Sequence, residues 1–215
     1  MKKIIIFDLD GVLINSKQNM SLSWAAVKKK HKLEQTFQIY FENIGAPFQI
    51  ILKKIGINNK NFLIEKTFKE NSIKNFNKIT LYSGVLRTLK ILKKQNILGL
   101  LTSKDKHRTL KLLKKFKIYE LFDFIECPNF KFRGKPYPDQ INKQIKNYKI
   151  KKKDVYYVGD MEYDYQTAKN AGINFIFASY GYGKLKKVRK IIKFLKLIKI
   201  NNENKWLLQT KKNIN

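Results

Sequence analysis

Two aspartates at the end of an apolar run are the residues of this chain best suited to chemistry. Asp8 and Asp10 follow the apolar residues 4–7 and precede Gly11. Residues two apart in an extended chain point to the same side, so both carboxylates would lie together beyond a buried strand. Open α/β sheets bind their ligands at this edge. A strand end of this kind can supply a nucleophile, a proton-transfer group and a metal site.

Further polar groups follow later apolar runs in the same way. Thr102 directly follows the second run, Lys135 lies in a Gly-Lys-Pro loop before a helical pattern, and Asp160 and Asp164 follow residues 155–158. The carboxyl ends of parallel strands share one edge of a sheet. We therefore expect these groups to meet the first aspartate pair.

These residue types together favour phosphoryl transfer. One carboxylate can attack phosphorus to form an aspartyl phosphate, and a second can protonate the leaving oxygen and then deprotonate water. A lysine and a hydroxyl can hold the oxygens of the transferring group. A metal ion must offset the repulsion between carboxylate and phosphate, and Mg²⁺ prefers hard oxygen ligands. The sequence therefore predicts Mg²⁺-dependent chemistry on a phosphorylated compound.

Alternating strand and helix patterns would position these residues. Helical spacing recurs between the apolar runs, and Ser83 is a candidate N-cap for the first such helix, which begins near residue 85. This alternation predicts an α/β fold, a parallel sheet covered by helices on both faces. The expected strands are residues 4–7, 97–101, 123–127, 155–158 and 174–178.

Residues 15–79 interrupt the alternation. Their apolar residues follow helical spacing, and Gly45, Pro47 and Gly56 separate several short helices. An insertion directly after the first strand would lie above the aspartates, so we expect a small helical cap there. The expected organisation is a core of residues 1–14 and 80–202, a cap of residues 15–79, and a polar C-terminal tail of residues 203–215.

Composition limits the class of protein. A chain of 215 residues can bury a real core, and with one cysteine, Cys127, it can form no internal disulfide. The start of the chain lacks a cleavage site for a signal peptide, and no apolar stretch is long enough to span a membrane. We expect a cytoplasmic monomer. Residues 188–198 should form a last helix on the sheet, with a helix lying on a membrane surface as the alternative.

The net charge of +30 raises nucleic acid as a partner. Only four of the 46 basic residues are arginine, which reads phosphates and base edges better than lysine does. We therefore attribute the lysine excess to codon usage and do not expect nucleic acid as the main partner. A basic nucleic-acid-binding protein on the same fold stays as the alternative, with a salt-dependent and metal-independent affinity as its signature.

The residues named above belong to four motifs. These motifs, in their order along the chain, resemble those of the haloacid dehalogenase-like hydrolases, in their phosphoglycolate phosphatase and β-phosphoglucomutase branch. The resemblance covers roughly residues 1–200, and it implies a Rossmann-like core with an inserted mobile cap. The motifs are Phe7-Asp8-Leu9-Asp10-Gly11-Val12-Leu13, Leu101-Thr102-Ser103-Lys104, Gly134-Lys135-Pro136-Tyr137-Pro138-Asp139 and Val158-Gly159-Asp160-Met161-Glu162-Tyr163-Asp164.

The resemblance implies a role for each matching acidic residue. Asp8 would be the nucleophile and a Mg²⁺ ligand, and Asp10 would be the acid/base, with its backbone carbonyl on the metal. Asp160 would bind Mg²⁺, and Asp164 would bind it or orient its waters.

The resemblance also implies how the substrate is held. Thr102 and Lys135 would hold the phosphoryl group, with Ser103, where the family often has asparagine, as a further phosphate-binding candidate. The expected enzyme is a phosphatase acting on a small phosphorylated metabolite through an aspartyl phosphate. Phosphoglycolate, a sugar phosphate and a nucleotide monophosphate stay open as substrates. A β-phosphoglucomutase-like phosphomutase is the nearest alternative.

Overall fold

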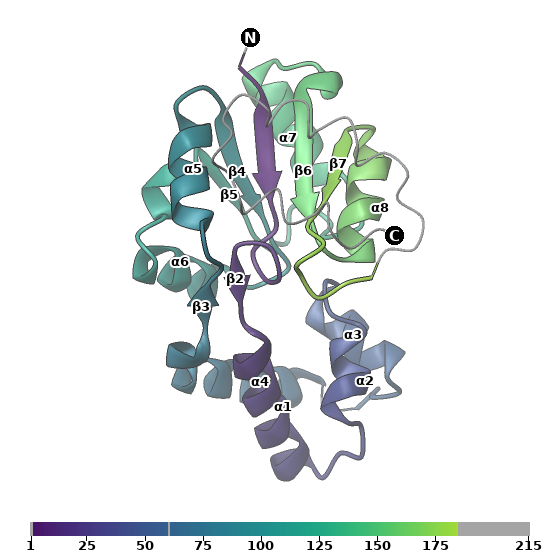
Figure 1. The fold of residues 1–215 in the computed structure, drawn as a ribbon. Helices are drawn as coiled ribbons and strands as arrows, with labels where there is room; N and C mark the ends of the chain where they lie inside the picture. Colours follow the sequence, from purple (N-terminus) through teal and green to yellow (C-terminus); the bar gives the residue numbers. More distant parts are fainter. Residues whose placement is uncertain (1, 60, 185–215) are drawn as a thin grey trace.

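A five-stranded parallel sheet forms the centre of the structure, a computed structural model that describes residues 2–59 and 61–184 (Figure 1). The strand order is β5-β4-β1-β6-β7, and every neighbouring pair is parallel. The strands are β1 (Ile4–Phe7), β4 (Ile97–Leu101), β5 (Phe124–Glu126), β6 (Val155–Gly159) and β7 (Asn174–Phe177). The expected α/β fold with a parallel sheet is confirmed, and each strand coincides with a predicted run to within a residue.

The central strand β1 sets the position of the first aspartate. All four of its residues are buried, because helices cover both faces of the sheet. Its register places Phe7 between Leu100 of β4 and Val158 of β6. The backbone N–H of Asp8 then donates to the carbonyl of Val158 at 2.9 Å. Asp8 therefore leaves the sheet level with the end of β6.

Two helices cover each face of the sheet. Ile5 and Phe7 pack with α5 and α6 on one side, and Ile4 and Ile6 pack with α7 and α8 on the other. The helices are α5 (Val85–Lys93), α6 (Lys106–Lys115), α7 (Asp139–Tyr148) and α8 (Glu162–Ala171), with short 3-10 turns η1 (Phe76–Lys78), η2 (Tyr119–Leu121) and η3 (Lys152–Asp154).

The prediction of Ser83 as an N-cap is wrong. Gly84 occupies that position with φ of 81°, a left-handed conformation that glycine adopts without steric cost. The turn into α5 therefore depends on backbone conformation, and no side chain caps this helix.

The helices of residues 17–74 form a second, smaller layer at the carboxyl ends of the strands (Figure 1). This layer has its own apolar core, in which the rings of Trp24 and Tyr40 stack 4.5 Å apart. A two-stranded antiparallel ribbon, not predicted from the sequence, connects it to the sheet. The elements are α1 (Lys17–His31), α2 (Phe37–Phe41), α3 (Phe48–Lys54) and α4 (Asn61–Lys74), between β2 (Ile14–Asn15) and β3 (Thr80–Leu81).

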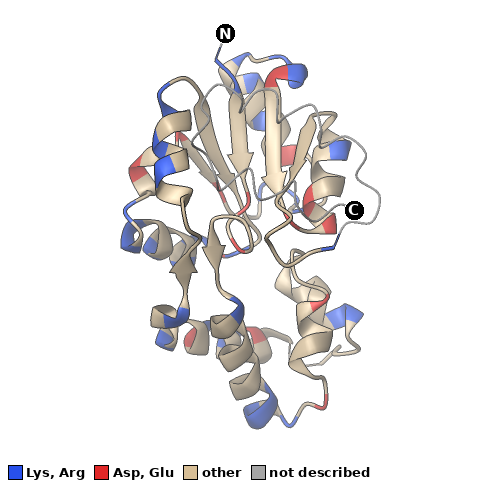
Figure 2. Ribbon diagram, in the orientation of Figure 1, with Lys and Arg blue, Asp and Glu red and all other residues tan. Residues whose placement is uncertain are grey.

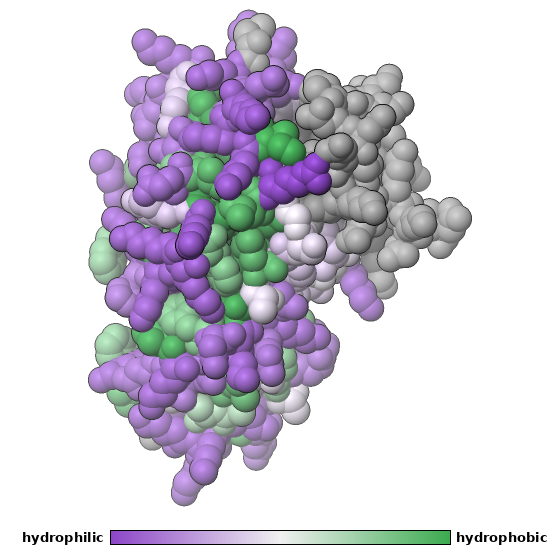
Figure 3. Space-filling view, turned by 60° about the vertical axis from the view of Figure 1, so that its left-hand side comes forward, coloured by the Kyte–Doolittle hydropathy of each residue, from purple (hydrophilic) through white to green (hydrophobic). Residues whose placement is uncertain are grey.

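Basic side chains spread over the helices of both layers, and acidic residues lie both on helices and in the loops at the carboxyl ends of β1 and β6 (Figure 2). On the face drawn in Figure 3, hydrophilic side chains surround a central strip of hydrophobic ones. Within residues 2–59 and 61–184, no helix has the length and apolar character needed to cross a bilayer. The expected helix at residues 188–198 and the polar tail at 203–215 lie outside the described residues.

Candidate active site

Three buried aspartates meet at the carboxyl edge of the sheet. Asp8 follows β1, Asp160 follows the adjacent β6, and Asp164 lies in the first turn of α8. One carboxylate oxygen from each lies within 4.8 Å of the other two. The parallel pairing of β1 and β6 therefore produces the acidic cluster expected from the sequence.

Lys135 reaches into this cluster from the loop between β5 and α7. Its Nζ lies 2.7 Å from Oδ1 of Asp8 and 2.7 Å from Oδ1 of Asp164, and its side chain is 2% exposed. Burial opposes the positive charge, but the carboxylates of Asp164 and Asp8 outweigh burial and raise the pKa of Lys135 above its ordinary value. The ammonium is therefore charged and held between two acids.

The acidic cluster carries more negative charge than Lys135 balances. Burial raises the pKa of Asp8 to about 7 against the opposing effect of Lys135, with Asp164 raising it further. Burial and the carboxylates of Asp164 and Asp8 hold the pKa of Asp160 well above its ordinary value. A cation bound here would relieve this repulsion.

Asp160 is the residue that best fits a metal. Its Oδ2 accepts a hydrogen bond from the backbone of Tyr182 at 2.7 Å, while its buried Oδ1 has no hydrogen-bond partner among the described residues. An unsatisfied buried oxygen is costly, and hard oxygen donors suit Mg²⁺. The backbone of Gly11 approaches Asp160 closely. A Cβ at Gly11, where φ is +85°, would lie 2.1 Å from Oδ2 of Asp160. The donor set and the orphaned oxygen together fit a divalent cation.

Asp164 is held rigidly from both sides. The hydroxyl of Tyr157 donates to its Oδ1 at 2.9 Å, and the backbone N–H groups of Asp160 and Met161 donate to its Oδ2 at 3.1 and 3.0 Å. It thus caps α8 and contacts Lys135 at the same time. Sequence reasoning missed Tyr157, which lies on the buried strand β6 without any local sign of a polar role.

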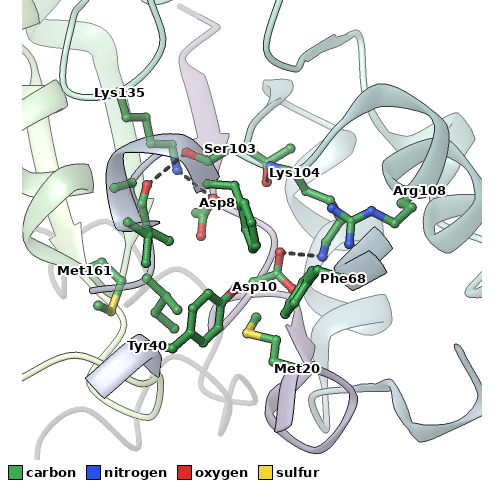
Figure 4. A pocket seen from close by; sticks show the side chains of 16 residues that line it. Asp8, Asp10, Met20, Tyr40, Phe68, Ser103, Lys104, Arg108, Lys135 and Met161 are labelled. Atoms are coloured by element: carbon green, nitrogen blue, oxygen red, sulfur yellow. Dashed lines mark hydrogen bonds and ion pairs between the residues drawn. The ribbon is translucent and has the colours of Figure 1, made fainter. Parts of the chain in front are cut away.

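Asp10 faces the pocket instead of the acidic cluster (Figure 4). Its Oδ2 lies 3.2 Å from Nζ of Lys104, and its Oδ1 accepts a hydrogen bond from Ser16. Burial lowers the pKa of Lys104, although Asp10 partly opposes the shift. Lys104 and Ser16 were not among the predicted site residues, and the position of Lys104 directly after the Thr-Ser pair was the available signal.

The other two predicted residues lie at the end of β4. Thr102 is buried and lines the pocket, and its hydroxyl accepts from the backbone N–H of Lys104 at 3.2 Å. Ser103 also lines the pocket, but its hydroxyl donates to the carbonyl of Gly45 at 2.9 Å. Because Gly45 lies between α2 and α3, Ser103 joins the sheet layer to the helical layer.

A small cavity of about 80 Å³ lies between the two layers (Figure 4). Its polar wall contains every predicted residue except the two acids Asp160 and Asp164. Aromatic and aliphatic side chains close the other wall, and Arg108 of α6 completes the lining. The helical spacing of residues 15–79 indicated a buried face but could not show which side chains face the cavity. Those that do are Met20, Tyr40, Ile44, Ala46, Phe48, Ile51 and Phe68.

Curated relatives cover most of this chain. The pyrophosphatase PpaX of Halalkalibacterium halodurans is 28% identical over 187 residues, which is 82% of this chain and 83% of that protein. The phosphoglycolate phosphatase of Aquifex aeolicus is 26% identical over 194 residues, which is 85% of this chain and 87% of that protein.

Solved structures show the same fold. The haloacid dehalogenase-like family hydrolase from Streptococcus pneumoniae superposes with a TM-score of 0.78 and 18% identity, covering 92% of this chain and 98% of that one. Both layers of the structure therefore have a counterpart in this fold.

The family model for haloacid dehalogenase-like hydrolases matches residues 5–178. That span contains both strand-end aspartates of β1, the hydroxyl after β4, Lys135 and the acids beside β6. The expected family and the expected class of enzyme, a hydrolase, are both confirmed. The chain belongs to the haloacid dehalogenase-like hydrolases.

Proposed function

We propose that this hydrolase is a Mg²⁺-dependent phosphatase acting on a small phosphorylated metabolite through an aspartyl phosphate at Asp8. The observation that carries the proposal is the position of Asp8. It lies between the ammonium of Lys135 at 2.7 Å and the acids Asp160 and Asp164, at the base of a cavity. A nucleophilic carboxylate needs this combination of positive charge and access.

The metal would be held by the carboxylates of Asp8 and Asp160 and by the backbone carbonyl of Asp10. Asp164 would orient the site, since both its oxygens already accept hydrogen bonds. When bound, Mg²⁺ supplies the positive charge that offsets repulsion between the carboxylates and a phosphate.

Each residue of the site then has its own role in the reaction. A carboxylate oxygen of Asp8 forms a bond to phosphorus as the bond from phosphorus to the leaving oxygen breaks, and Asp10 gives that oxygen a proton. The Asp10 carboxylate next takes a proton from water, whose oxygen attacks the same phosphorus and releases phosphate with Asp8 restored. Lys135 and Thr102 hold the transferring oxygens during both steps.

The size of the cavity favours a short substrate. Its volume of about 80 Å³ is well below the roughly 300–1,000 Å³ of pockets that hold drug-sized ligands. The relatives are named pyrophosphatase and phosphoglycolate phosphatase, after two short phosphorylated compounds, which supports a substrate of either kind. We propose that residues 15–79 act as the cap over it, excluding water, with the Ser103–Gly45 hydrogen bond as one contact of the closed form.

Phosphate release from a panel of compounds tests this function. We expect release from phosphoglycolate or pyrophosphate in the presence of Mg²⁺ and none with EDTA. Release that persists without metal would contradict the metal role. A folded protein that releases phosphate from no compound would contradict the phosphatase, and interconversion of hexose phosphates would then indicate the phosphomutase.

Mg²⁺ should also stabilise the protein without any substrate. At about 100 times its Kd, a ligand that binds only the folded state adds about 2.7 kcal/mol to the free energy of unfolding. We expect Mg²⁺ to raise the Tm of the wild-type protein and to leave that of Asp160→Asn unchanged. The exposed neighbour Glu162→Gln is the control and should respond like the wild type. Equal stabilisation of the Asp160→Asn protein would place the metal elsewhere.

A further inference from the structure

Arg108 of α6 is buried in the pocket wall, and part of its guanidinium has no hydrogen-bond partner among the described residues. The residue is 8% exposed, and its Nε lies 2.5 Å from Oδ2 of Asp105, the N-cap of α6. Its buried Nη1 has no hydrogen-bond partner within the part of the chain that the structure describes. A buried charged donor without a partner is costly, which indicates that a ligand completes the site.

This guanidinium lines the cavity beside Lys104. Figure 4 shows both cations on one side of the pocket, with Lys135 and Asp8 on the other and Asp10 between them. The two cations interact. Burial is the largest cause of the lowered pKa of Lys104, and repulsion from Arg108 lowers it further. Lys104 pairs with the carboxylate of Asp10, at 3.2 Å. The wall therefore places two basic side chains away from the nucleophile, and the Nη1 of Arg108 is the donor there that no carboxylate among the described residues contacts.

The residue type adds to the argument. Only four of the 46 basic residues of this chain are arginine, so lysine is the ordinary cation here. A guanidinium presents a planar fork of donors that matches the two oxygens of a carboxylate or phosphate, which an ammonium does not. Asp105 occupies the Nε side of Arg108 and leaves the far end of the fork for another oxyanion.

We propose that Arg108, together with Lys104, binds a second oxyanion of the substrate, the group that is not hydrolysed. The substrate class is then a short compound with a phosphoryl group at one end and a carboxylate or second phosphate at the other. Arg108 determines specificity, while Lys135 and Asp8 act on the phosphoryl group. This inference rests on the proposed phosphatase function and names the substrate class of the same site.

Matched pairs of substrates test it. Phosphoglycolate is compared with ethyl phosphate, which has the same length and lacks the carboxylate, and pyrophosphate is compared with methyl phosphate. We expect the wild-type enzyme to favour the two-anion compound of one pair by about 10-fold or more in kcat/KM. The pair that shows the preference tells whether the second oxyanion is a carboxylate or a phosphate.

Substitution of the arginine should reduce this preference. Arg108→Gln removes a charge-assisted contact, so the ratio of kcat/KM values within the preferred pair should fall roughly 10- to 100-fold. Arg108→Lys keeps the positive charge but lacks the planar fork of donors, so in this variant the ratio of kcat/KM values should fall by less. Lys114→Gln, at an exposed position of the same helix, is the matched control and should keep the wild-type ratio.

The outcomes distinguish a failure of the Arg108 inference from a failure of the proposed phosphatase function. Wild-type enzyme that hydrolyses ethyl or methyl phosphate as well as the two-anion compounds overturns the inference and leaves the phosphatase standing. An unchanged ratio in both Arg108 variants does the same. Failure to hydrolyse any of the four compounds, or any other phosphate ester, overturns the phosphatase itself. If Arg108→Gln does not fold, the wild-type ratio still tests the substrate class, and Arg108→Lys still tests the role of the guanidinium.

Discussion

Asp8→Asn is expected to lower the rate of phosphate release by about 10³-fold or more, because the amide cannot form the bond to phosphorus. The substitution keeps the size of the side chain in a site where the carboxyl is already buried and its pKa is raised to about 7. A loss of activity without a loss of folding is therefore expected. Phosphate release and thermal melting, measured on the same preparation, check both parts.

The control for this variant is Asp154→Asn, which changes the same functional group in η3, at the other end of β6. It should retain the wild-type rate. Acid-quenched wild-type enzyme should carry a phosphoryl group on Asp8, found by mass spectrometry of its peptides, and the Asp8→Asn enzyme should carry none. Turnover within 10-fold of the wild type in Asp8→Asn would exclude Asp8 as the nucleophile.

Lys135→Met is expected to lower the free energy of unfolding of the metal-free protein by about 3–5 kcal/mol, the cost of removing one partner from a buried ion pair. Methionine has a similar length, so little of this loss comes from an empty cavity. The loss comes from Asp8 and Asp164, which lie 2.7 Å from the ammonium and would face each other without it. Phosphate release should fall as well, since the transferring oxygens lose their cation.

The stability loss in Lys135→Met should depend on pH. Burial raises the pKa of Asp8 to about 7, so Asp8 takes up a proton below that pH and then needs no counter-charge. The loss should therefore be smaller at about pH 5 than at about pH 8, as measured by urea unfolding in EDTA. Lys93→Met is the control, because Lys93 pairs with Asp123 at the surface and should cost at most about 1 kcal/mol. A loss of that size in Lys135→Met would show that the buried pair contributes little.

The strands and the flanking helices could be predicted from the sequence because their signals are local. A short apolar run bounded by polar residues is buried on both faces wherever helices cover a sheet, and residues 4–7 and 155–158 behave this way. Gly172 ends α8 with φ of 70°, as a glycine after a helical pattern should. Parallel pairing then places the residues after each strand at one edge, which is why Asp8 and Asp160 could be paired in advance.

The parts that could not be predicted are those without a local pattern. The strands β2 and β3 have two residues each, too few to show alternation, and they form only because they pair with one another. The turn at Gly84 depends on a backbone angle. Ser103 could equally contact a phosphate or the helical layer, and its hydrogen bond to Gly45 depends on how that layer closes.

The sequence by itself determined the family, the α/β sheet and the identity of the acids, because residue types at strand ends carry that information. The tertiary structure alone decided which basic side chains contact these acids. Lys135 and Asp8 are 127 positions apart. The motif around Lys135 made it a candidate for holding phosphate, but nothing local showed that it pairs with Asp8 and Asp164, that Lys104 pairs with Asp10, or that Arg108 lines the cavity. Burial turns these side chains into partners, since ionic contacts strengthen and unpaired groups become costly only where water is excluded.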